Sequence, residues 1–153
     1  MRSACSAPHG FRSMIEVGVV QIVFCSRVVD PQDTKNSERN VREILRNARV
    51  RNARQGVTGA LLTDRASFAQ VAEGPIASIE SMYSSVINDK RHHGVELLQY
   101  AVTHVRLLPS RALAFAEVDR IPHVGGINGH STSLDRRRAY FSVLAALQPL
   151  LLG

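Results

Sequence analysis

The sequence has no tryptophan, few other aromatic residues (5%) and only two cysteines among its 153 residues. Cys5 and Cys25 lie far apart and form no CxxC pair, so the usual spacing of a zinc site is missing. No apolar run is long enough to span a membrane, and the first residues lack the apolar core of a secretory signal. These absences favour a reduced, cytoplasmic protein in which residues 1–16 form a flexible leader.

Motifs of enzymes are missing as well. The sequence contains no GxGxxG, no P-loop and no nucleophile elbow with matching histidine and aspartate partners. His92 and His93 are adjacent, and no third metal ligand is evident beside them, which argues against a metal site. We therefore expect neither an enzyme nor a metal centre.

The net charge of +6 permits contact with nucleic acid or other anions. However, the arginines are scattered, only residues 136–138 form a triple, and aromatic residues are not interleaved with them. The charge pattern favours solvated helix faces, and we do not expect a nucleic-acid partner.

Apolar patterning predicts one domain of alternating strands and helices. A run rich in β-branched residues predicts a first strand over 17–26, and a polar loop follows over 27–38. Apolar residues then recur at helical spacing over 41–48, so we expect a helix that Ser37 caps and Gly56 ends.

Two short apolar runs follow, over 57–64 and 67–74. Only two residues separate them, which predicts a hairpin. Pro75 suits the first turn of a second helix, because its missing N–H has no partner there in any case. Two more strands are expected over 95–105 and 111–118.

The resulting order, β-α-β-β-α-β-β, predicts an α+β fold with both helices on one face of the sheet. The domain would cover 17–118, a Gly-rich linker 119–133, and a C-terminal helix 134–153. The last helix has two interpretations. It covers the free face of the sheet, or its apolar part, 140–151, is a contact surface for a second copy or a signalling partner.

Gln70 is the unusual residue of the hairpin. Strand alternation places it with Phe68 and Ala72 on one face. A buried glutamine amide needs partners for its two donors and its acceptor. Taken alone, Gln70 is interpreted as bonded to backbone or water, and the neighbouring Glu73 as a turn residue.

Three segments, "NARQGVTGALL", "SFAQVAEG" and "NDKRHHGVELL", occur in this order at close spacing. Together they resemble the BLUF family, the flavin-based blue-light sensor domains, over about 17–118. The resemblance implies a ferredoxin-like fold that holds FAD between its two helices.

The resemblance also implies roles for matching residues. Asn52 would bond the pyrimidine carbonyl of the flavin, and Gln70 would face its N5 and O4 atoms. Arg51 holds the position where the family has a second asparagine or a similar polar residue. The implied cofactor-binding residues are Asn52, Gln70, Ile44, Leu61, Phe68, Asp89, Arg91 and His92.

Two of these assignments have structural alternatives. Asn52 also suits the C-terminal turn of a helix. Arg91 and His92 are placed to contact a phosphate, but basic residues also favour a helix C-terminus that is simply solvated.

Several positions depart from the family pattern. Phe24 stands where the family has a tyrosine, which gives an electron and a proton to the excited flavin. Arg111 and Leu113 replace a tryptophan and a methionine, and Ala72 replaces a leucine. Because phenylalanine has no hydroxyl, it supplies no proton and cannot anchor Gln70.

We therefore expect a domain that binds FAD and signals through protein association, without the standard photocycle. Redox or flavin-occupancy sensing is compatible with such a domain. The alternative is a ligand-free structural or protein-interaction domain with the same fold.

Overall fold

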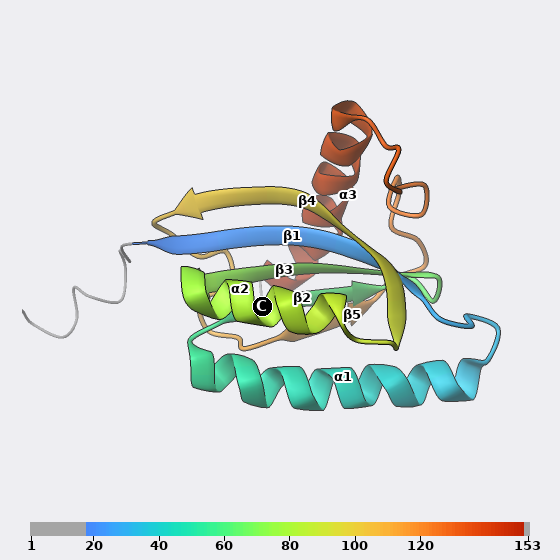
Figure 1. Cartoon of the computed structure of the whole chain (residues 1–153), viewed down its shortest axis with the longest axis horizontal. Coiled ribbons are helices and arrows are strands. Elements are labelled where there is room, and N and C mark those ends of the chain that lie inside the picture. Colours follow the sequence, from blue (N-terminus) through green and yellow to red (C-terminus); the bar gives the residue numbers. More distant parts are fainter. Residues whose placement is uncertain (1–17, 152–153) are drawn as a thin grey trace, which may run out of the picture.

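The structure is a computed structural model, and it describes residues 18–151. The predicted order of elements is confirmed, including the helix expected at the C-terminal end (Figure 1). The elements are β1 (Val19–Val28), α1 (Thr34–Gln55), β2 (Thr58–Thr63), β3 (Ser67–Pro75), α2 (Ile76–Ile87), β4 (His92–Thr103), β5 (Ala114–Glu117) and α3 (Ser133–Leu151). The leader predicted for residues 1–16, with Cys5, lies outside the described residues.

The strands form one five-stranded sheet in the order β4-β1-β3-β2-β5. Neighbouring strands are antiparallel except for β2 and β5, which are parallel. Each helical crossover leaves room for another strand between the two strands that it joins, which is the ferredoxin-like arrangement. The predicted fold class is therefore confirmed.

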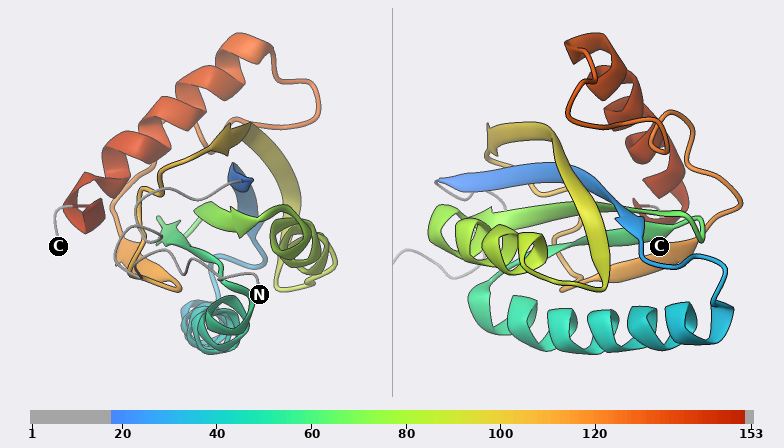
Figure 2. Two further views of the ribbon diagram at one scale, coloured as in Figure 1. Left: turned by 90° about the vertical axis from the view of Figure 1, so that its left-hand side faces the viewer. Right: turned by 45° about the vertical axis from the view of Figure 1, so that its right-hand side comes forward.

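Helices cover both faces of the sheet, with α1 and α2 on one side and α3 on the other (Figure 2). Strand alternation decides which residues meet which helix. Ile22 packs with α2, whereas Val23 and Cys25 pack with α3. Burial raises the pKa of the Cys25 thiol to about 11, and the charge of Glu96 acts in the same direction. Cys25 is thus an unreactive strand residue, as its sequence context indicates.

The C-terminal helix places a buried stripe on the sheet: Ala139, Val143 and Leu147. This arrangement supports the first interpretation of the helix, in which it covers the free sheet face. The segment before it also packs there, because Ile121 and Ile127 are buried in the same core. None of the helices within residues 18–151 is long and apolar enough to cross a membrane.

The first helix begins earlier than predicted, and the Ser37 cap is wrong. Asp33 is the N-cap, and its carboxylate accepts a hydrogen bond from the Asn36 N–H at 3.1 Å. Ser37 instead lies inside the first turn. The predicted end is confirmed, because Gly56 adopts the left-handed conformation with φ 70° that closes many helices.

Glu73 is not a turn residue, contrary to expectation. It lies in β3, is fully buried, and accepts three hydrogen bonds through its carboxyl group. The donors are Gln21 Nε2 at 2.9 Å, the Leu107 N–H at 2.7 Å and the Leu108 N–H at 3.2 Å. Glu73 thereby attaches the connection between β4 and β5 to the centre of the sheet.

The last two strands also differ from their predicted limits. β4 begins at His92, because this residue pairs with Val28 of β1. β5 begins only at Ala114, since the preceding backbone bonds to α1 and β2 instead. Arg49 donates to the Leu113 carbonyl at 3.0 Å, and the Gly59 N–H donates to the Arg111 carbonyl at 3.0 Å.

Gly59 generates a stability prediction. A Cβ at this position would clash with the backbone carbonyl of Val71 in the neighbouring strand. We expect Gly59→Ala to lower the free energy of unfolding by about 1–3 kcal/mol, the usual cost of overpacking. Gly126→Ala is the matched control, because nothing lies within 4 Å of a Cβ there. Equal urea midpoints for the two variants would show that β2 and β3 are not packed this closely.

Candidate functional site

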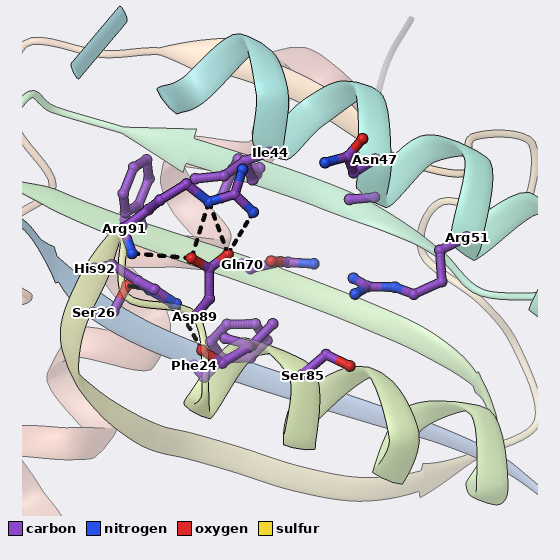
Figure 3. Close-up of a pocket in the computed structure, with 14 residues that line it drawn as sticks. Phe24, Ser26, Ile44, Asn47, Arg51, Gln70, Ser85, Asp89, Arg91 and His92 are labelled. Atoms are coloured by element: carbon purple, nitrogen blue, oxygen red, sulfur yellow. Dashed lines mark hydrogen bonds and ion pairs between the residues drawn. The ribbon is translucent and has the colours of Figure 1, made fainter. Parts of the chain in front are cut away.

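A cleft lies between α1 and α2, with the sheet as its floor (Figure 3). It brings together most of the predicted site residues, which come from α1, β2, β3 and the segment after α2. These residues are Ile44, Leu61, Phe68, Gln70, Asp89, Arg91 and His92. The cleft combines apolar walls with a few polar groups, which is the usual composition of a site for an organic ligand.

Gln70 lies on the floor of the cleft. It is 7% exposed, and its partners across the sheet are Phe24 of β1 and Leu61 of β2. No hydrogen bond joins its side-chain amide to another residue within 18–151, and the residue lines the cleft. The backbone therefore does not bind this amide, which faces a cleft that can hold a ligand.

Asn52 lies next to this cleft but is not among the residues that line it. Its side-chain N–H donates to the Ala112 carbonyl at 2.9 Å. The main-chain carbonyl of Asn52 accepts a hydrogen bond from the Val57 N–H at the end of α1. Its Oδ1 atom is buried without a partner in the described part of the chain. One of the two N–H groups of the Asn52 amide is therefore engaged with the backbone of the connection before β5.

Asp89 and Arg91 form a pair at one side of the cleft. Arg91 Nε lies 2.9 Å from Oδ1 of Asp89, and Nη2 lies 2.6 Å from Oδ2. Burial alone would raise the pKa of Asp89, but the hydrogen bonds and charge of Arg91 outweigh it and lower this pKa. The two charges thus neutralise each other within the site.

His92 is held from both ring nitrogens. Nδ1 lies 2.6 Å from Ser26 Oγ, and Nε2 lies 2.8 Å from the Val86 carbonyl oxygen. The ring also meets Phe68 edge to face. In this arrangement His92 forms part of the wall and joins β1 to α2, and neither nitrogen is directed to a phosphate.

The altered family positions lie in different places. Phe24 lines the cleft and meets the Tyr83 ring edge to face, with 5.5 Å between centroids. Leu113 is buried against Phe68 in the core below α1, whereas Arg111 is exposed. Of the three, Phe24 is the one that borders the cleft beside Gln70.

Sequence reasoning missed Asn47 and Arg51 as residues of this cleft, although Arg51 was noted as a departure from the family. Both line it together with Ile44, and the three share one face of α1. The spacing of three and four residues was the available signal. Arg51 is half-buried, and its Nε atom has no partner within residues 18–151.

The match to a known family covers most of the domain. The family described as "BLUF: Sensors of blue-light using FAD" matches residues 19–114. Photoactivated adenylate cyclase subunit beta of Euglena gracilis is 37% identical over 67 residues, which are 44% of this chain and 8% of that protein. The blue light- and temperature-regulated antirepressor BluF of Escherichia coli (strain K12) is 33% identical over 78 residues, 50% of this chain and 18% of that protein. This chain thus covers less than a fifth of either relative.

Solved structures agree with the fold. BlrB, a BLUF protein in its dark state, superimposes with a TM-score of 0.63 at 25% identity, over 88% of this chain and 99% of BlrB. BlsA in its photo-activated state gives a TM-score of 0.65 at 18% identity, over 88% of this chain and 96% of BlsA. At 18% identity, the similarity to BlsA shows a shared fold and nothing more.

The carboxyl of Glu73 generates a prediction about the site, because the segment that it holds carries the partner of Asn52. In Glu73→Gln an amide N–H group faces backbone N–H donors, and a buried donor stays unsatisfied. We expect a loss of about 1–3 kcal/mol in unfolding free energy and faster hydrogen exchange at the Leu107 and Leu108 amides. Glu117→Gln, on the exposed end of β5, is the control. Unchanged exchange at these two amides would contradict the anchoring role.

Proposed function

The chain belongs to the BLUF family of blue-light sensors that use FAD, and from this premise we propose how the domain works. FAD binds in the cleft between α1 and α2, and the flavin does not follow the tyrosine-dependent photocycle. One observation carries this proposal: the Gln70 amide, which has no protein partner within residues 18–151, faces a cleft with apolar walls beside a phenylalanine.

The residues of the cleft fit a flavin. An isoalloxazine ring has an apolar body and an edge of alternating donors and acceptors. Ile44, Leu61 and Phe68 supply apolar walls, and the Gln70 amide supplies a donor and an acceptor. These features support the cofactor assignment independently of the sequence motifs.

When bound, FAD supplies absorption of blue light and a site that accepts electrons. The chain itself orients the polar edge through Gln70 and keeps water from the ring with Leu61 and Phe68. The Asp89–Arg91 pair closes one side of the cleft. We assign the domain a sensory role and no catalysis of its own.

Phe24 decides what the domain does with light. It is directly opposite Gln70 in the antiparallel pair of β1 and β3. Its ring offers no proton to transfer and no hydroxyl that would fix the orientation of the Gln70 amide. Gln70 then holds the ligand without being switched by the residue at position 24, so the domain responds to the presence or the redox state of the flavin.

Output through association is the second part of the proposal. The inner stripe of α3 covers the sheet, so a partner would meet the outer surface, where Leu134 is 56% and Phe141 is 52% exposed. A second copy or a downstream signalling protein in the cytoplasm is the expected partner. The division into a sensory unit over 17–118, a linker over 119–133 and a C-terminal helix belongs to the same proposal.

Thermal stability distinguishes flavin binding from the ligand-free alternative. Added FAD should raise Tm, because a ligand that binds only the folded state stabilises it by about 2.7 kcal/mol at ~100 times Kd. Gln70→Leu should weaken this response, whereas Gln148→Leu on the exposed side of α3 should not. A Tm that ignores FAD in the unsubstituted protein would favour a ligand-free interaction domain.

Light difference spectra test the role of Phe24. With FAD bound, the unsubstituted protein should show no reversible red shift under blue light. Phe24→Tyr should gain one, because it returns a hydroxyl next to Gln70. Phe141→Tyr adds the same hydroxyl on the exposed side of α3 and should behave like the unsubstituted protein. A reversible red shift without any substitution would show that the tyrosine is dispensable here.

A further inference from the structure

One cationic side chain of the cleft, Arg51, has no direct partner within residues 18–151, whereas Arg91 pairs with both Asp89 and Glu43. Four side chains that line it are arginine, aspartate or histidine: Arg51, Asp89, Arg91 and His92. Asp89 and Arg91 bond each other, and both nitrogens of His92 are engaged. Arg51 makes no hydrogen bond or ion pair with another residue of 18–151, and its Nε is buried without a partner.

Burial makes this charge unfavourable in the absence of a ligand. Desolvation lowers the pKa of Arg51, while the charge of Asp89 opposes that effect and the charge of Arg91 adds to it. A guanidinium stays charged in proteins, so the cost of burying this charge is not removed by loss of a proton. An anionic or electron-rich group of a ligand would supply the missing partner.

The direction of Arg51 indicates which part of a ligand it meets. The side chain leaves α1 and points across the cleft, and the Gln70 amide points toward it (Figure 3). Gln70 lies at the floor among Leu61 and Phe68. A phosphate dianion is poorly placed beside these apolar side chains, whereas the polar edge of a planar ring fits between them and the two polar groups.

We propose that Arg51 stabilises the negative charge that the flavin ring acquires on reduction, and so sets the redox response of this domain. This inference rests on the proposed binding of FAD. Two-electron reduction with uptake of one proton leaves one net negative charge, and a fixed cation at the ring edge favours that state over the neutral oxidised state. The partly dry cleft strengthens the effect, because charges interact more strongly where water is excluded.

Arg51 and Phe24 then both favour a response to redox state over a response to light. Phe24 withholds the electron and proton that a tyrosine would give to the flavin after light absorption. Arg51 favours electrons that arrive from an external reductant of the dithiol or nicotinamide class. The site would thus report the redox state of its surroundings through the reduced fraction of its flavin.

A reductive titration with dithionite, followed by absorption, tests the proposal on the full chain reconstituted with FAD. Arg51→Gln should lower the ratio of reduced to oxidised affinity by about tenfold or more, and tenfold equals about 30 mV for a two-electron couple. Arg51→Lys keeps the positive charge but lacks the planar guanidinium. The reduction potential of its flavin should therefore lie between those of the unsubstituted protein and Arg51→Gln. Arg46→Gln removes the same charge from an exposed position on α1 and should leave the potential unchanged.

Binding of riboflavin and FMN separates the ring from the phosphates. If Arg51 meets the ring, Arg51→Gln should weaken binding of reduced riboflavin as much as that of reduced FMN. A loss confined to FMN and FAD would overturn the proposal in favour of a phosphate contact. An unchanged potential in both Arg51 variants would also overturn it while leaving FAD binding intact. Failure of the unsubstituted protein to bind any flavin would instead reject the proposed function as well.

Discussion

The buried carboxyl group of Glu73 is the interaction on which the site depends. A carboxyl group is expensive to bury unless donors surround it, and Glu73 has Gln21 and the backbone of Leu107 and Leu108 as donors. The need for these donors holds the connection between β4 and β5 against the C-terminal end of β3. The same connection then supplies the carbonyl of Ala112 to the side chain of Asn52. The end of α1, and with it one wall of the cleft, is positioned by a buried carboxyl group that does not line the cleft.

Three side chains that line the cleft distinguish this site from one in which a tyrosine drives the light response. Gln70 presents an amide with no protein partner in the described chain, Phe24 faces it without a hydroxyl, and Arg51 points toward it with an Nε atom that has no partner there. The first favours a ligand with a polar edge. The second removes a donor of electrons and protons, and the third favours added negative charge. Together they support the proposal of a flavin site that reports redox state.

Much of the fold follows from local pattern. Strand alternation placed Gln70 and Phe68 on one face, and the conformational freedom of glycine placed the end of α1 at Gly56. Two local predictions were wrong for a related reason. Ser37 and Glu73 are polar residues beside turn-like sequences. The local sequence was therefore compatible with a helix cap at Ser37 and with a turn at Glu73. Their actual roles were decided by Asp33, which caps the helix first, and by backbone donors far along the chain.

The sequence by itself determined the order of elements, the fold class and half of the residues that line the cleft, because periodicity and short motifs are local properties. Tertiary structure alone decided where their polar atoms are directed. Asn52 bonds a carbonyl 60 residues away, and Glu73 bonds an N–H 34 residues away. Within residues 18–151, Arg51 Nε is left without a partner, while the nearby Asp89 is bonded to Arg91. Such competition for partners depends on three-dimensional distances, which the periodicity of one chain does not encode.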